Sequence, residues 1–173
     1  MLLNLNNGCL LCPISCGADR SQNAGACRAG DKLKIAKFYL HKFEEPCISG
    51  KNGSGTVFFC GCSLACKFCQ NFEVSRNLRG KEISVSELAE IFYRLEQDGA
   101  ENINLVSPTQ FSDKIIRALE IYKPQIPVVY NTHGYEKLDL LREIDGFIDV
   151  YLPDLKFFSP FTFKALHGQR KLL

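Results

Sequence analysis

The sequence has no apolar run long enough to cross a membrane and almost no excess charge of either sign. No stretch approaches the ~18 apolar residues of a transmembrane helix, and the N-terminal residues lack the basic region that begins a signal peptide. The 21 basic and 19 acidic residues leave a net charge of +2, which gives no electrostatic footprint for nucleic acid or an anionic membrane. We therefore expect a cytoplasmic protein with no nucleic-acid partner and no membrane partner.

Cysteine, by contrast, is abundant. The sequence has nine cysteines, a high count and an odd one. In a secreted protein such a count would suggest disulfides. Without an export signal, the tight C-x2-C and C-x3-C spacings indicate ligands of a metal or cluster that are kept reduced in the cytoplasm.

The chain divides near residue 55, and low-complexity segments and fine repeats are absent from both parts. Residues 1–55 are predicted to be an irregular, Cys-rich segment whose one sustained apolar stretch is 33–43. Residues 56–158 form the predicted core, followed by a tail at 159–173. Strands are predicted at 56–61, 102–108, 126–132 and 148–156, and helices at 84–99, 111–123 and 136–144. This alternation predicts an α/β fold with right-handed βαβ units and a parallel sheet.

Polar residues follow each predicted strand. The cysteine loop follows the first strand, and the next three end in polar side chains: Ser107, Thr109 and Gln110; Asn131 and Thr132; Asp154 and Lys156. In parallel sheets chemistry collects at the C-terminal ends of the strands. We therefore expect these groups to share one site.

The cysteine loop itself is "GCSLACKFCQN", in which Cys62, Cys66 and Cys69 have the spacing C-x3-C-x2-C. Zinc sites usually combine C-x2-C pairs into four ligands. Three thiolates could instead hold three irons of a 4Fe–4S cluster and leave the fourth iron open to a small molecule. Cys60 is an alternative fourth ligand, but side chains in its predicted strand alternate in direction.

This loop resembles the cysteine signature of radical S-adenosylmethionine (SAM) enzymes, with Phe68 as the aromatic residue before the third cysteine. The segments "EEPCISGKNGSGTVFFCGC", "GAENINLVSPTQF", "PVVYNTHGYE" and "DVYLPDLKF" resemble the branch described as pyruvate formate-lyase activating enzyme-like proteins. The resemblance covers about residues 9–158. It implies a partial, open β/α barrel of about four βα units, in which the C-terminal part of the family's barrel is lacking.

The resemblance also implies roles for individual residues. Cys62, Cys66 and Cys69 would bind the 4Fe–4S cluster, and SAM would bind its open iron. Further SAM-binding positions are implied by the matching motifs, namely Asn71, Ser107, Thr109, Gln110, Asn131, Thr132, Asp154 and Lys156. "SPTQ" departs from the Gly-Gly-Glu of many members, and Asn131 replaces a frequent aspartate.

The N-terminal segment carries a second cysteine group, Cys9, Cys12, Cys16 and Cys27. Their spacing fits zinc or a second iron–sulfur cluster, and a reduced set without metal is the alternative. Cys47 and Cys60 are interpreted as small packed residues. His133 is interpreted as a loop residue rather than a ligand or base, and it is left out of the catalytic set.

By this resemblance the function is reductive cleavage of SAM to a 5′-deoxyadenosyl radical by an activase. The implied partners are a glycyl radical enzyme as protein substrate and a flavodoxin- or ferredoxin-type reductant. Two alternatives stay open: a cluster-binding electron-transfer protein, and a truncated, inactive fragment.

Overall fold

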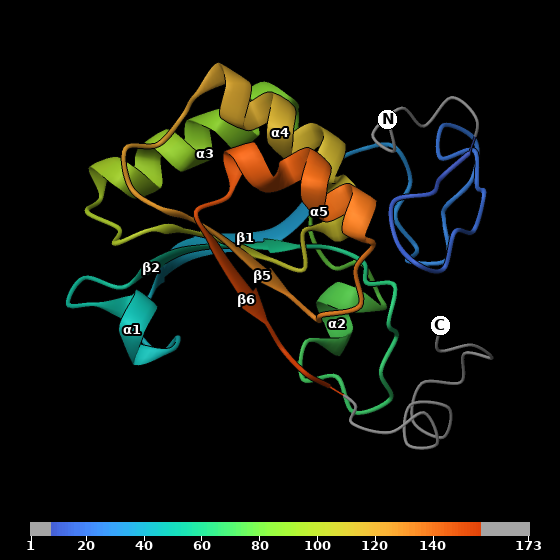
Figure 1. Ribbon diagram of the computed structural model, residues 1–173, viewed down its shortest axis with the longest axis horizontal. Coiled ribbons are helices and arrows are strands. Elements are labelled where there is room, and N and C mark those ends of the chain that lie inside the picture. Colours follow the sequence, from blue (N-terminus) through green and yellow to red (C-terminus); the bar gives the residue numbers. More distant parts are fainter. Residues whose placement is uncertain (1–7, 157–173) are drawn as a thin grey trace.

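The computed structural model describes residues 8–156, and its centre is a six-stranded sheet with the order β3-β1-β2-β4-β5-β6 (Figure 1). The strands are β1 (Lys34–His41), β2 (Ser54–Phe59), β3 (Lys81–Glu82), β4 (Ile103–Val106), β5 (Val128–Thr132) and β6 (Val150–Pro153). The helices are α1 (Pro46–Ser49), α2 (Phe72–Ser75), α3 (Val85–Gln97), α4 (Ser112–Ile121) and α5 (Leu138–Ile144), with 3-10 turns η2 (Thr109–Phe111) and η3 (Asp145–Phe147). The tail predicted at 159–173 lies outside the described residues.

The predicted parallel sheet and its helices are confirmed. The pairs β2–β4, β4–β5 and β5–β6 are all parallel, and α3, α4 and α5 fall between these strands along the chain. Figure 1 shows the three helices together on one face of the sheet. The predicted α/β class and the partial β/α barrel are therefore correct.

The expectation that residues 1–55 are irregular is wrong for β1 and α1. β1 pairs antiparallel with β2 on one side and with β3 on the other. Its exposure pattern is irregular, with one buried residue, Ile35, so the sequence carries no clean alternation from which a strand could be predicted. The strand forms because its backbone completes the ladder of β2. The predicted boundary after residue 55 also falls inside β2, which begins at Ser54.

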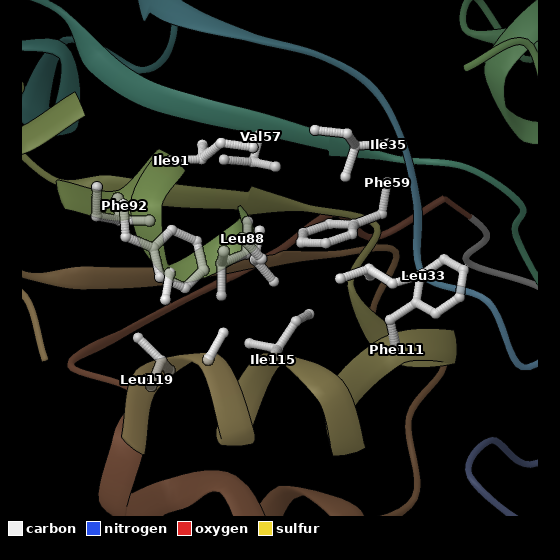
Figure 2. Close-up of a cluster of buried hydrophobic side chains, with 14 of the residues drawn as sticks. Leu33, Ile35, Val57, Phe59, Leu88, Ile91, Phe92, Phe111, Ile115 and Leu119 are labelled. Carbon is white, nitrogen blue, oxygen red and sulfur yellow. The ribbon is translucent and has the colours of Figure 1, made fainter. Parts of the chain in front are cut away.

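The main core lies between the sheet and the layer formed by α3 and α4 (Figure 2). Val57 and Phe59 of β2 contribute from the sheet, while Leu88 and Phe92 contribute from α3. All four side chains are almost fully buried. Alternate residues of β2 and every third or fourth residue of α3 supply this core, as the two structural periods require.

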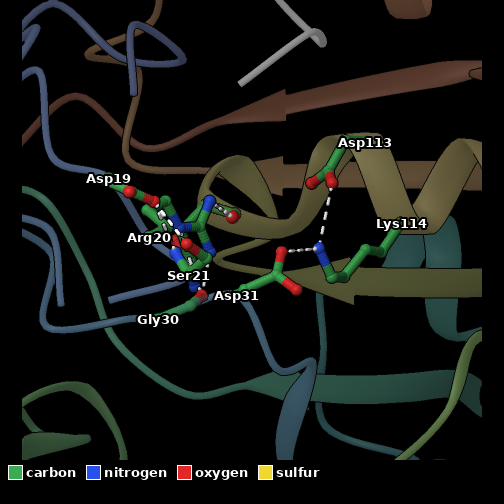
Figure 3. A network of polar contacts seen from close by, with 8 residues as sticks. Asp19, Arg20, Ser21, Gly30, Asp31, Asp113 and Lys114 are labelled. Atoms are coloured by element: carbon green, nitrogen blue, oxygen red, sulfur yellow. Dashed lines mark hydrogen bonds and ion pairs between the residues drawn. The ribbon is translucent and has the colours of Figure 1, made fainter. Parts of the chain in front are cut away.

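The Cys-rich segment is attached to this layer by a buried arginine. The Arg20 guanidinium donates hydrogen bonds to the carbonyl oxygens of Gly30 and Gln110 and lies 5.5 Å from the ring centre of Phe111. Nearby, Lys114 of α4 forms ion pairs with Asp31 and Asp113 (Figure 3). Cys9 and Leu11 add apolar contacts against residues of α4, β5 and α5. The segment is thus part of the folded unit.

Within residues 8–156, no helix combines the length and the apolar character that a membrane crossing requires.

The capping box at the N-terminus of α3 makes a testable contribution to stability. Ser84 Oγ accepts a hydrogen bond from the Glu87 backbone N–H, and the Glu87 carboxylate accepts one from the Ser84 N–H, which is a complete capping box. Ser84→Ala should lower the free energy of unfolding by about 1 kcal/mol in urea denaturation. Ser86→Ala, at an exposed position inside the same helix, is the matched control and should change it by much less. Equal effects in both variants would contradict the capping role.

Candidate functional site

The C-terminal ends of the parallel strands β2, β4, β5 and β6 lie along one edge of the sheet, because all four strands run in the same direction. Each of the predicted site segments follows one of these ends. The loop of Cys62, Cys66 and Cys69 follows β2, Ser107–Gln110 follows β4, Asn131 and Thr132 end β5, and Asp154–Lys156 follows β6. The structure therefore brings all of these segments to one edge.

The three loop cysteines gather in one small cluster. Cys66 is buried beside Leu64, and Cys62, Cys69 and Tyr135 pack against this pair. The Cys69 Sγ lies 3.3 Å from the Ser75 Oγ of α2, and the Cys69 N–H donates to the Cys66 carbonyl oxygen. The cluster joins the cysteine loop to the loop that follows β5.

Burial and mutual repulsion oppose ionisation of these thiols. Burial raises the pKa of Cys62 to about 11, with a further increase from the nearby Cys66 and Cys69 thiols. Burial and the Cys69 thiol also raise the pKa of Cys66, while the positive charges of Lys156 and Arg76 act to lower it. Lys156 is therefore close enough to the cysteine cluster to favour negative charge there.

The donor set fits an iron–sulfur cluster in its chemistry. Within residues 8–156 no three His, Cys, Asp or Glu side chains already stand in the geometry of a metal site. Cys62, Cys66 and Cys69 nevertheless lie in one cluster with cationic side chains nearby, and thiolates are the ligands that iron–sulfur clusters use. Cys60 is directed elsewhere: its Sγ is 3.7 Å from the Arg79 carbonyl oxygen, and burial alone raises its thiol pKa to about 11.

Gln110 connects the end of β4 to the start of the cysteine loop. Its buried Nε2 donates to the carbonyl oxygens of Cys60, Gly61 and Ser107, at 3.0, 3.0 and 2.8 Å. Ser107 has a φ of +55°, in the left-handed region that a non-glycine residue enters at a cost. The Gln110 amide thus braces the two strand ends, and its role as a SAM contact stays a prediction.

Asp154 and Lys156 are the exposed members of the set, and Asn71 is half-buried. The Asp154 backbone N–H donates to the Thr132 carbonyl oxygen, which fixes the end of β6 against β5. The Asp154 carboxylate and the Lys156 ammonium form an ion pair. Asn71 precedes α2, and its side chain makes no capping bond. These three side chains lie at the same edge as the cysteine cluster, and their SAM contacts stay predictions.

A buried carboxylate that sequence reasoning missed lies between β4 and β5. The Glu136 Oε1 accepts hydrogen bonds from the hydroxyls of Thr109, at 2.6 Å, and of Thr132. Its Oε2 is buried without a hydrogen-bond partner. Burial raises the pKa of Glu136 to about 7, although both threonine hydroxyls act to lower it. "THGYE" shows a glutamate beside a predicted site, but its burial depends on residues far away in sequence.

His133 lies in the loop after β5, as expected, and it makes a buried contact that the sequence did not predict. Its ring is 9% exposed, and the Nε2 lies 3.1 Å from the Oγ of Ser63 in the cysteine loop. Sequence spacing gives no signal for this contact, because the two residues are separated by 70 positions. The interpretation of Cys47 as a packed residue is wrong, because Cys47 is exposed, whereas Cys60 is buried as expected.

The N-terminal cysteines also lie near one another. A side chain added at Gly25 would meet the sulfurs of both Cys16 and Cys27 within 3.5 Å. Burial raises the pKa values of Cys12 and Cys27. The group contacts the cysteine loop directly, since the Cys62 N–H donates to the Cys27 carbonyl oxygen at 3.1 Å.

Comparison with known proteins shows the family to which this chain belongs. Residues 56–172 match the Radical SAM superfamily, and the chain belongs to this superfamily. It is 32% identical over 163 residues to the uncharacterized protein MJ0674 of Methanocaldococcus jannaschii, an alignment that covers 89% of this chain and 47% of that protein. The chain thus spans about half the length of the curated relative it matches. No solved structure matches it.

The elevated pKa of Glu136 makes stability depend on pH. The folded protein holds a proton on this group up to about pH 7, while the unfolded chain releases it near pH 4.5. The contribution of the protonated Glu136 to the free energy of unfolding is therefore fully present below about pH 4.5 and is lost as the pH rises through 7. In urea denaturation, the free energy of unfolding of the wild type should fall by about 2–3 kcal/mol between pH 5 and 8, and Glu136→Gln should abolish this fall. Glu143→Gln is the control, and identical pH profiles for wild type and Glu136→Gln would contradict the assignment.

Proposed function

We propose that this chain is a radical SAM enzyme of the activating-enzyme type, which generates a radical on a partner protein by hydrogen abstraction. The observation that carries the proposal is the meeting of the cysteine cluster with the polar strand ends at one edge of the sheet. Tyr135, in the loop after β5, packs against the cysteine cluster, and the charge of Lys156 acts to lower the pKa of Cys66. The motif segments resemble the pyruvate formate-lyase activating enzyme-like branch and support this choice within the superfamily.

Cys62, Cys66 and Cys69 would hold the 4Fe–4S cluster. Such a cluster, with SAM bound, supplies the electron that cleaves SAM to methionine and a 5′-deoxyadenosyl radical. The chain would contribute the binding surface. Lys156 can attract the SAM carboxylate, and the Asp154 carboxylate can accept hydrogen bonds from ribose hydroxyls. Asn71 can add a further contact, because its side chain makes no capping bond to α2.

The partners follow from this chemistry. The protein substrate would be a glycyl radical enzyme in its inactive form, and a flavodoxin- or ferredoxin-type protein would supply the electron. An electron-transfer protein would bind the iron–sulfur cluster, but its cluster would not respond to SAM. An inactive fragment would bind neither the cluster nor SAM. Measurements of cluster assembly and of SAM binding therefore separate these two alternatives from the enzyme.

The first test is cluster assembly. After anaerobic reconstitution with iron and sulfide, Ala substitutions at Cys62, Cys66 or Cys69 should each abolish the redox-active chromophore of this site. Cys60→Ala and Cys47→Ala should leave it intact, because the Cys60 sulfur is directed to Arg79 and Cys47 is exposed on α1. Equal loss in Cys60→Ala would indicate four protein ligands and no open iron.

The same samples address the N-terminal cysteines, which we propose as a second metal site. Cys9, Cys12, Cys16 and Cys27 supply four sulfurs, the donor set of a closed structural zinc site. The sulfurs of Cys16 and Cys27 both lie beside Gly25, which supports this proposal. Elemental analysis of the variant that lacks all three loop cysteines should still find zinc or iron, and its absence would reject the second site.

SAM binding is tested by the electron paramagnetic resonance spectrum of the reduced cluster during titration with SAM. Lys156→Ala should weaken SAM binding roughly ten- to hundredfold, as expected for loss of a charge-assisted contact of about 1.5–3 kcal/mol. Lys123→Ala, an exposed lysine after α4 at the opposite edge of the sheet, is the control and should bind SAM like wild type. A wild-type spectrum that does not change with SAM would reject the enzyme proposal for this chain.

A further inference from the structure

His133 and Ser63 form a buried polar contact between the end of β5 and the cysteine loop. Ser63 is 2% exposed and directly follows Cys62, while His133 directly follows Thr132 at the end of β5. The distance between the Ser63 Oγ and the His133 Nε2 is 3.1 Å. Neither side chain has so far been given a role in cofactor binding.

The backbone fixes the direction of this hydrogen bond. The Tyr135 N–H donates to the His133 Nδ1 at 3.1 Å. Because a backbone N–H can only donate, Nδ1 must be an unprotonated acceptor, and the ring proton resides on Nε2. The imidazole therefore donates from Nε2, and the Ser63 oxygen accepts.

The cysteine loop needs such an anchor, because its backbone is not relaxed. Ala65, between Cys62 and Cys66, has a φ of +57°, a left-handed conformation that residues other than glycine adopt at a cost. A strained conformation persists only where surrounding contacts hold it. The Ser63–His133 bond joins this strained segment to the end of β5.

We propose that His133 is a positioning residue that orders the cysteine loop, through its Nε2–H bond to Ser63, before any metal binds. The identity of what the loop then binds rests on the proposed function. The ordering itself is a property of the metal-free chain, so it can be measured separately.

The test compares hydrogen exchange of the amides of residues 62–69 in the reduced, metal-free chain. His133→Leu and Ser63→Ala should each accelerate exchange about tenfold, which corresponds to 1.4 kcal/mol. The double variant should exchange no faster than the faster single variant, since both remove one bond. His133→Gln places an amide donor near the Nε2 position and should restore most of the protection.

His41→Leu is the matched control. The His41 Nδ1 also accepts a backbone N–H two residues ahead, from Phe43, and its ring lies on β1. This variant should leave exchange in the cysteine loop unchanged. Nitrogen-15 NMR of the wild type should show His133 protonated on Nε2 and unprotonated on Nδ1.

Two results would overturn the proposal: unchanged exchange in His133→Leu and Ser63→Ala, or equal acceleration in His133→Gln and His133→Leu, which would indicate packing alone. A second experiment reconstitutes the iron–sulfur cluster anaerobically. The initial rate of iron uptake should fall about tenfold in His133→Leu, as the exchange protection does, and should recover in His133→Gln. If wild type takes up no iron while the exchange pattern holds, the proposed function fails and the positioning role stands.

Discussion

The side-chain amide of Gln110 is the contact on which the candidate site most depends. A single buried nitrogen reaches carbonyl oxygens at the end of β2 and at the end of β4, and the Gln110 carbonyl oxygen in turn accepts from Arg20. Buried carbonyl groups left without a donor are costly, so this amide fixes the separation of two strand ends at the point where the cysteine loop departs. The geometry of the candidate site at this edge rests on that separation.

Two kinds of buried ionisable group lie at the C-terminal ends of the strands, the cysteine thiols and the Glu136 carboxyl group. The thiols of Cys62 and Cys66 are buried and resist deprotonation, yet metal binding requires thiolates and therefore releases protons. Lys156 offsets part of this cost from an exposed position. Glu136 lies deeper, and burial raises its pKa to about 7, so it is about half protonated at neutral pH. The site therefore combines an exposed ion pair of Lys156 with Asp154 and a buried carboxyl group that titrates near neutral pH.

Local patterns predicted much of this molecule, and contacts between distant residues account for the remainder. The four parallel strands and three helices follow from apolar periodicity, and the loop cysteines follow from a spacing that is visible within eight residues. β1 was missed because it is held by its pairing with β2 and has no alternating apolar face. The contacts of His133 with Ser63 and of Glu136 with Thr109 were not predicted, because these partners follow other strands, whose ends only the folded sheet brings together.

The hydrogen bond from the Cys62 N–H to the Cys27 carbonyl oxygen joins the backbones of the two cysteine groups. If each group binds a ligand, this contact gives the two binding events a direct backbone connection. Thermodynamic reciprocity would then require each ligand to change the affinity of the other group for its own ligand by the same factor. One peptide contact thus links the Cys-rich segment to the loop that leaves β2 in the radical SAM core.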